Sequence, residues 1–223
     1  TEGGSLPAAL RSDAPYAPSI DPASFTTEID NPYFPLRPGT RWVLTGSGDS
    51  EGEITTTTVL EETREVMGVT CVVVHDEVAV DGRPVEITSD WYAQDADGNV
   101  WYFGEETAEY EDGKVTSTAG SWEAGVDGAQ PGIIMPAHPD VGVTYRQEFY
   151  AGEAEDVAKV VELGQSVSTP VGTYDDVLVT EDWTPLEPDV RERKFYARDV
   201  GLVREELVEG GSGETVLTEF TSG

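Results

Sequence analysis

The sequence contains few of the side chains that most enzymes use for chemistry. Its 223 residues include two histidines, His75 and His138, and a single cysteine. Neither histidine lies in a His-Glu-x-x-His motif or beside a cysteine pair, so a zinc enzyme of the usual kinds is not expected. His75 alternates with apolar residues and is interpreted as structural. His138 follows a long loop and is the better candidate for a ligand-binding residue.

Carboxylates are abundant and could bind a cation. Calcium requires several oxygen ligands at roughly 2.3 to 2.6 Å, and segment 95–99, Asp-Ala-Asp-Gly-Asn, carries oxygens on alternate residues. Its spacing does not fit an EF-hand, so a hairpin turn is the preferred interpretation. A divalent cation such as calcium could be held elsewhere, and the candidate metal ligands are Asp127, Glu105 and Glu109.

Two carboxylates that face each other could also hydrolyse a glycosidic bond. With so many acids such pairs arise by chance, and the chain has no Gly-x-Ser-x-Gly elbow, phosphate-binding glycine loop or dinucleotide fingerprint. A small carboxylate-dependent hydrolase or cyclase therefore remains an alternative. The structural feature expected of such an enzyme is a buried acid with a strongly raised pKa.

Aromatic side chains gather between positions 91 and 122 and could stack on a sugar or an apolar ligand. The candidate ligand-binding residues, besides His138, are four rings of this region: Trp91, Trp101, Tyr102 and Trp122. Core packing is the alternative explanation for most of them.

The charge of the chain restricts its partners. There are 44 acidic and 13 basic residues, and the formal net charge is −31. The acids run from Glu2 to Glu219, so the charge belongs to the whole surface. Nucleic acid and anionic membrane surfaces are not expected as partners, because both would be repelled. A small ligand or a cation remains as a partner.

Asp-Gly pairs indicate how these residues are positioned. They occur at 81–82, 97–98 and 112–113, between stretches rich in Val, Thr, Tyr and Trp. Asp-Gly favours the positive φ angles of a type I′ hairpin, so the spacing predicts four antiparallel strands at 69–80, 83–95, 99–111 and 114–122. A two-residue turn at 97–98 would pair Tyr92 with Phe103 and Ala93 with Tyr102.

The remaining pattern predicts an all-β fold, an antiparallel β-barrel or curved half-barrel of about ten strands. Alternation stops between 120 and 142, which is interpreted as a long loop covering the concave face. Further strands are expected at 156–167, 176–183, 191–197, 201–208 and 215–220. Residues 1–30 are rich in proline and predict an extended N-terminal arm, and residues 31–223 a single antiparallel β domain.

Several segments resemble a family of uncharacterised exported bacterial proteins. These are PYFPLRPGT at 32–40 followed by Trp42, WYAQDADGNVWYFGE at 91–105, WEAGVDGAQPGIIMP at 122–136, TPLEP at 184–188 and GLV at 201–203. More loosely, the chain is similar to envelope proteins with a curved, half-open antiparallel sheet. The resemblance implies export and a β fold, and it carries no activity or catalytic residue.

The leading hypothesis is a secreted or cell-envelope protein, non-catalytic and extracytoplasmic, that binds a ligand or cation in its concave face. The chain begins at Thr1 without an apolar signal region, which is expected of a mature exported product. A second hypothesis is a structural subunit that self-associates when its N-terminal arm adds to a neighbour's sheet edge.

Overall fold

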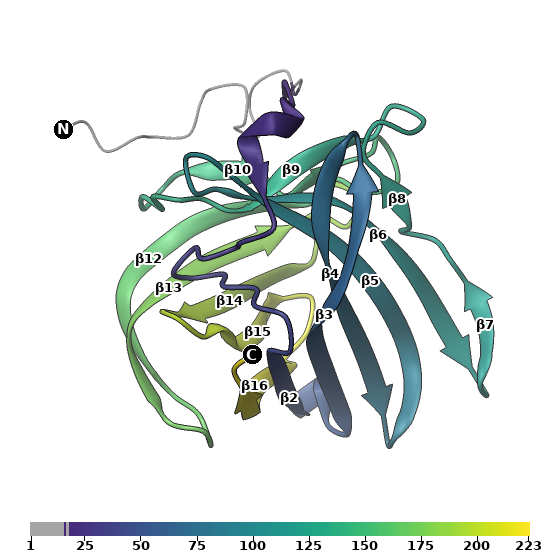
Figure 1. The fold of residues 1–223 in the computed structure, drawn as a ribbon. Helices are drawn as coiled ribbons and strands as arrows, with labels where there is room; N and C mark the ends of the chain where they lie inside the picture. Colours follow the sequence, from purple (N-terminus) through teal and green to yellow (C-terminus); the bar gives the residue numbers. More distant parts are fainter. Residues whose placement is uncertain (1–15, 17) are drawn as a thin grey trace.

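The computed structural model describes Tyr16 and residues 18–223, and it confirms the all-β fold (Figure 1). The bounds of its sixteen strands follow the chain. They are β1 (Phe25–Thr26), β2 (Arg41–Ser47), β3 (Glu53–Val66), β4 (Val69–Val80), β5 (Arg83–Asp95), β6 (Val100–Glu111), β7 (Lys114–Ser117), β8 (Trp122–Glu123), β9 (Gln130–Met135), β10 (Thr144–Arg146), β11 (Glu148–Phe149), β12 (Val157–Ser168), β13 (Thr173–Trp183), β14 (Arg191–Ala197), β15 (Gly201–Glu209) and β16 (Glu214–Thr221). Short 3₁₀ turns, η2 (Pro22–Ser24) and η3 (Gly48–Ser50), accompany them.

Glycine turns connect the central strands as the sequence predicts. Asp81 and Gly82 have φ angles of 51° and 74°, and Asp112 and Gly113 have the same pair of values. Positive φ at both central residues defines a type I′ turn. The turns join β4 to β5 with Val80 opposite Arg83, and β6 to β7 with Glu111 opposite Lys114.

The sheet curls until its two edges nearly meet. The strand order is β10-β12-β13-β14-β15-β16-β2-β3-β4-β5-β6-β9-β11, with β1 added on β5 and with β7 and β8 added on β6. The edge strands β10 and β11 are separated in the sequence by Gln147 alone. Because one short stretch of chain contributes both edges, the barrel is nearly closed, and its thirteen-strand path is longer than the expected ten.

The segment 120–142 was expected to be a loop, and this prediction is wrong in part. The segment contains β8 and β9, and β9 pairs with both β6 and β11. Consecutive residues of β9, Pro131 to Ile133, are buried, so both faces of the strand are covered. A strand buried on both faces lacks the alternating pattern that reveals a half-exposed strand.

The turn at 97–98 also differs from the prediction, and it changes which residues share a face. The backbone N–H of Gly98 donates to Asp95 O at 3.0 Å, and that of Asp95 donates to Asn99 O at 2.9 Å. Such a three-residue loop, with Gly98 at φ 91°, is a common hairpin connection. It shifts the register by one residue from the expected pairing, so Tyr92 lies opposite Tyr102 and Ala93 opposite Trp101.

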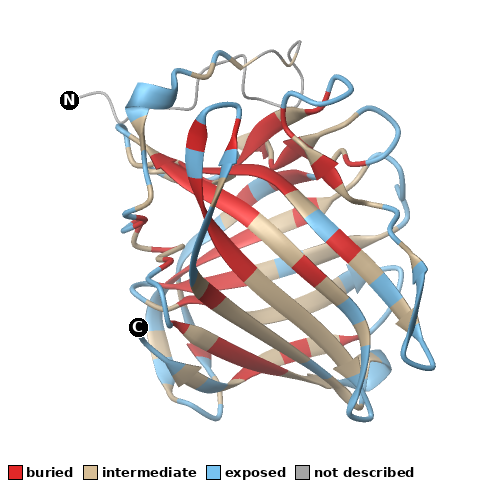
Figure 2. Ribbon diagram, turned by 45° about the vertical axis from the view of Figure 1, so that its right-hand side comes forward, coloured by how far each residue is buried: buried red, intermediate tan, exposed pale blue. Residues whose placement is uncertain are grey.

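Burial is concentrated at one end of the barrel. Figure 2 shows buried residues along the strands near η2, and exposed residues at the hairpin tips of the opposite end. No helix in the described part of the chain has the length and apolarity needed to cross a membrane.

Residues 1–15 and 17 of the predicted arm, residues 1–30, lie outside the described residues. Its described part contacts the chain's own barrel: β1 pairs with β5, and the Tyr16 hydroxyl donates a hydrogen bond to Pro131 O. Assembly through the arm stays a prediction.

Candidate functional site

A cavity of about 240 Å³ lies inside the barrel. Strands from opposite walls contribute its polar side chains: Asp76 from β4, Asp90 and Tyr92 from β5, and Lys194 and Tyr196 from β14. Alternate residues of a strand point to the same face of a sheet, so positions 90 and 92, like 194 and 196, enter the cavity together. Most of its apolar lining comes from β2, β15 and the segment before β2: Phe34, Pro35, Leu36, Trp42, Leu44 and Leu202.

The crossing segment, residues 29–38, covers this cavity as the chain passes between the two walls of the barrel toward β2 (Figure 1). The Asn31 side-chain amide donates to the carbonyls of Gly98 and Pro136, and Pro32 O accepts a bond from Asp199 N. The segment is thereby attached to both walls. Between these attachments the Phe34 ring contacts a tyrosine from each wall. Its centroid lies 5.4 Å from that of Tyr92 on β5 and 6.3 Å from that of Tyr196 on β14.

Lys194 is surrounded by acids. Its Nζ lies 3.7 Å from Asp182 Oδ2, 3.8 Å from Glu192 Oε2 and 3.9 Å from Glu205 Oε2. Burial lowers the pKa of Lys194, but the three carboxylates outweigh it and hold that pKa well above its usual range. The ammonium is therefore charged, and its charge is already neutralised by residues of its own wall.

The acids of the opposite wall, Asp76 and Asp90, have no cation in direct contact among the described residues. Burial raises the pKa of Asp76, although the bond from Thr57 and the charges of His75 and Lys194 lower it. Asp90 accepts a hydrogen bond from Tyr102 Oη at 2.5 Å, and Asp76 accepts one from Thr57 Oγ1 at 2.5 Å. Burial, together with the charges of Asp76 and Glu86, raises the pKa of Asp90 to about 7 despite the bond from Tyr102. Neither Asp76 nor Asp90 forms an ion pair with any described residue.

Glu105 lies directly opposite Asp90 on β6. Burial and the charges of Asp90 and Glu148 raise its pKa to about 9. A β-bulge places it there, because Phe103 has no partner on β5 and the residues on either side of it, Tyr102 and Gly104, pair with Tyr92 and Trp91. The extra residue turns both Tyr102 and Glu105 toward the barrel interior, which simple alternation would not do.

Further buried polar groups lie on the edge strands β10 and β11 and on β13. Glu148 Oε2 accepts a bond from Trp122 Nε1 at 2.8 Å, and burial with the charge of Asp156 raises the pKa of Glu148 to about 8. Asp182 Oδ2 accepts a bond from Gln147, whereas its Oδ1 has no hydrogen-bond partner among the described residues. The fully buried Tyr145 hydroxyl also lacks one.

Two of the four aromatic residues that were predicted to bind a ligand lie inside the barrel. The Tyr102 ring stacks on Tyr92 at 4.8 Å with an interplanar angle of 19°, and Trp122 contacts the edge of Tyr102 at 5.3 Å. Tyr102 and Trp122 also donate to the two carboxylates described above. They therefore support the cavity from behind and do not line it.

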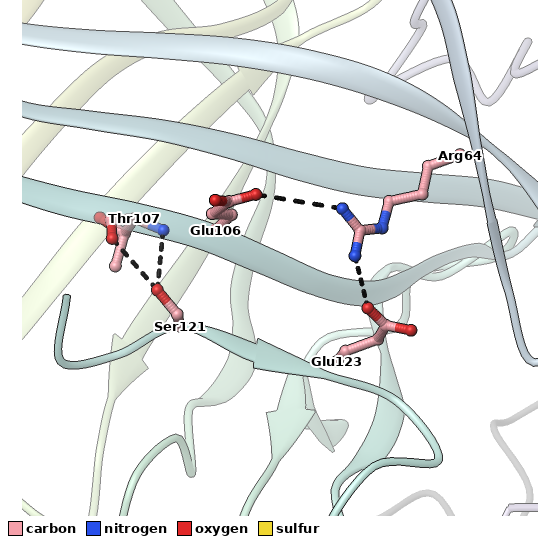
Figure 3. Close-up of polar contacts among 5 residues, drawn as sticks. All are labelled: Arg64, Glu106, Thr107, Ser121 and Glu123. Atoms are coloured by element: carbon pink, nitrogen blue, oxygen red, sulfur yellow. Dashed lines mark hydrogen bonds and ion pairs between the residues drawn. The ribbon is translucent and has the colours of Figure 1, made fainter.

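Trp91 and Trp101 lie on the opposite face of the sheet, so the structure does not bring the four rings together. The Arg64 guanidinium covers Trp91 at 3.8 Å from the ring centroid and is held by Glu123 Oε2 at 2.6 Å (Figure 3). Trp101 donates to Asp95 Oδ2 at 2.7 Å and packs against Phe25. Alternation of residues along β5 and β6 explains the separation.

A hydrogen-bonded serine completes this outer face. Ser121 Oγ accepts from Thr107 N at 3.0 Å and donates to Thr107 O at 3.1 Å (Figure 3). It joins the segment before β8 to β6. The outer face of this hairpin is therefore covered by the chain's own residues.

His138 is exposed and lies away from the barrel cavity. It borders a surface hollow with Tyr33, Asp176 and Arg198, and the latter two form an ion pair. The structure therefore does not bring His138 together with the aromatic candidates. Its position next to the crossing segment follows from the turn after β9.

The predicted metal ligands do not form one group. Glu105 and Glu109 are four residues apart on β6, about 13 Å along a strand, and Asp127 lies in the turn between β8 and β9. Throughout the described ranges there is no group of three or more His, Cys, Asp or Glu side chains that could hold a metal ion. The Asp95 carboxylate accepts bonds from Asp97 N, Asn99 N and Trp101 Nε1, which agrees with its interpretation as a turn residue.

Comparison with known proteins finds solved structures that are only weakly similar to this chain. No protein-family model matches the chain, and no curated protein matches it. One similar structure is a protein described as exported, with a YmcC-like fold, from Bacteroides fragilis NCTC 9343; it is 17% identical, with a TM-score of 0.48 over 86% of this chain and 100% of that one. Another, described as a lipoprotein from Parabacteroides distasonis ATCC 8503, is 15% identical, with a TM-score of 0.45 over 86% of this chain and 99% of that one. At such low identities and TM-scores, neither likeness establishes a property of this chain.

The residues that line the cavity were not among the candidates predicted from the sequence. Asp76, Asp90 and Lys194 are charged residues on strands that also carry many buried apolar side chains. A charge inside an otherwise buried strand is expensive unless it has a partner, so it points to an ion pair or a binding site. Applied to each strand, that test includes these positions but also marks charged neighbours such as Glu77 and Arg193.

Proposed function

We propose that this protein is an exported, non-catalytic binding protein whose barrel cavity holds one small amphipathic molecule. The observation that carries the proposal is the cavity itself, with an apolar lining from the crossing segment, β2 and β15 and a polar lining from β4, β5 and β14. Pockets for small molecules combine apolar surface with a few placed polar groups in this way.

The size of the cavity limits the ligand. A cavity of about 150 Å³ holds benzene. The cavity of about 240 Å³ therefore fits a molecule of about ten non-hydrogen atoms.

Export is supported by the acidic composition and by the resemblance of segments 32–40, 91–105 and 122–136 to an exported family.

A cavity-filling substitution tests this function. We expect phenethyl alcohol, with about nine non-hydrogen atoms, to bind saturably to the wild type, as measured by chemical-shift titration. Leu202 lines the cavity, and Leu202→Trp should weaken binding at least about tenfold by occupying the space. Val208 lies on the same strand but is 37% exposed, so Val208→Trp should bind like the wild type. Equal affinity of both variants and the wild type would contradict the proposal.

Catalysis is a second candidate, favoured by one observation. Asp90 and Glu105 are opposite each other and have raised pKa values, the property expected of a carboxylate-dependent hydrolase. Structural networks also raise pKa values, so the test is direct. If the pair is catalytic, wild-type protein should hydrolyse a member of a chromogenic glycoside panel and Asp90→Asn should not. Equal, background rates for both would exclude hydrolysis of these glycosides.

A further inference from the structure

We infer that the ligand of the barrel cavity is an organic cation, an amine or quaternary ammonium attached to an apolar group, whose charge is recognised by Asp76 and Asp90. The inference rests on the proposed function, because it names the class of molecule that would occupy that cavity. It follows from the distribution of charges and rings around the space.

The two walls of the cavity differ in how far their charges are paired. Lys194 is the one cationic side chain that lines the cavity within the described part of the chain. It lies within 4 Å of three carboxylates that belong to its own side of the barrel. Its charge also lowers the pKa of Asp76, but burial outweighs this effect and keeps that pKa raised. Neither Asp76 nor Asp90 has an ion-pair partner among the residues described.

The hydrogen bonds leave one oxygen of each acid without a donor. Asp76 receives its bond on Oδ2 from Thr57, and Asp90 receives its bond on Oδ1 from Tyr102. The remaining oxygens, Asp76 Oδ1 and Asp90 Oδ2, receive no hydrogen bond from a described side chain. Both residues line the cavity. A protonated amine placed there would supply the missing donors, and a hydrogen bond to a charged group is stronger than one between neutral groups.

A second observation concerns buried polar atoms behind Lys194. Asp182, 6% exposed, has its Oδ1 without a hydrogen-bond partner, and the fully buried Tyr145 hydroxyl also lacks one. Asp182 lies beside Lys194. The interior thus has unpartnered polar atoms on the lysine side as well, behind the side chains that line the cavity.

Aromatic rings make the cavity suitable for an organic cation. Phe34, Trp42, Tyr92 and Tyr196 line it, and the face of an aromatic ring attracts a cation. A hard metal ion would need six or more oxygen ligands, whereas the cavity offers two carboxylates among rings and aliphatic side chains. The lining therefore favours a cation with an apolar body over calcium.

Three compounds of matched shape test the inference: phenethylamine, phenethyl alcohol and phenylacetate, each with about nine or ten non-hydrogen atoms. At pH 8 the amine is protonated and Asp90, with a pKa of about 7, is largely ionised. We expect titration calorimetry to show the amine binding about tenfold more tightly than the alcohol, and the anion most weakly.

Isosteric variants assign the effect to the two acids. Asp76→Asn and Asp90→Asn should each weaken amine binding about fivefold to tenfold while changing alcohol binding by less than about twofold. Alcohol binding also reports that each variant is folded. Glu111→Gln removes the same charge from an exposed position at the end of β6, and it should leave all three affinities unchanged. That control separates local recognition from the general attraction of an acidic protein for cations.

The outcomes are distinguishable. If the alcohol binds as tightly as the amine, or if Asp76→Asn and Asp90→Asn leave their ratio unchanged, the cation inference is wrong while the proposed binding function stands. If none of the three compounds binds, or if Leu202→Trp does not weaken the binding observed, the proposed function fails and the inference fails with it.

Discussion

Gly104→Ala is expected to lower the free energy of unfolding by about 2 to 5 kcal/mol, because it combines backbone strain with overpacking. Gly104 has a φ angle of 135°, which residues with a Cβ rarely adopt. A Cβ at this position would lie 2.4 Å from Trp122 O and 3.0 Å from Trp91 Cζ3. Urea denaturation followed by tryptophan fluorescence measures the loss.

Gly113→Ala is the matched control for this prediction. Gly113 also has a positive φ angle, 74°, but nothing lies within 4 Å of the position of its Cβ. The control therefore reports backbone strain alone and should cost about 1 kcal/mol. Equal losses for the two variants would show that the close approach of β8 to β6 at Gly104 does not contribute.

The same substitution should disturb the candidate site. Gly104 follows the extra residue of the bulge that turns both Tyr102 and Glu105 into the barrel. If alanine forces the bulge to shift, Tyr102 loses its 2.5 Å bond to Asp90. We therefore expect weaker binding of phenethylamine by any Gly104→Ala protein that remains folded.

The stability of the protein is expected to fall as the pH rises from 5 to 9. The pKa values of Glu105 and Glu148 are raised to about 9 and about 8, and those of Asp90 and Glu205 to about 7, in each case chiefly by burial. In the unfolded chain these acids titrate near pH 4. The folded state therefore binds more protons between pH 4 and 9. The contribution of these acids to stability is complete below pH 4, decreases as the pH rises, and is fully lost once the pH passes their folded pKa values of about 7 to 9.

Thermal unfolding at several pH values measures this effect. Because the net charge of −31 also destabilises the fold at high pH, the series should be repeated at about 1 M salt, where the screening length is about 3 Å and surface repulsion is largely removed. A decline that persists in salt comes from the buried acids. A melting temperature that is constant or rises from pH 5 to 9 in salt would contradict the prediction.

Glu105→Gln should stabilise the protein at pH 8 and flatten its pH dependence. The amide removes the ionisation that burial and Asp90 oppose, and we expect a gain of about 1 to 3 kcal/mol, reduced from the full pKa shift because Glu105 is only partly buried. Glu111→Gln, at an exposed position, is the control. An equal gain in both variants would assign the effect to net charge.

Local sequence features predicted the strands because turn preferences and the alternation of apolar residues are properties of short segments. Asp81-Gly82 and Asp112-Gly113 specify their turns through backbone preferences of two residues, and β4, β5 and β14 have the bounds that the sequence predicted. Alternation of apolar residues then reports which strands have one buried face. The strand β9 escaped detection because both of its faces are buried.

The candidate site was predicted only in part, because single-residue shifts reverse the face of every side chain that follows. A three-residue loop at 96–98 and the bulge at Phe103 each shift the register by one. Tyr102 therefore faces the barrel interior beside Tyr92, whereas Trp91 and Trp101 face outward.

The sequence by itself determined the all-β class, the main hairpins and the acidic character that restricts the partners of this protein. The tertiary structure alone decided where the charges meet. Asp90 and Lys194 are 104 positions apart in the chain and line one cavity because the sheet curls until β5 and β14 form opposite walls. Contacts across a closed barrel depend on strand order and register, which are set by the packing of the whole sheet and by no local pattern.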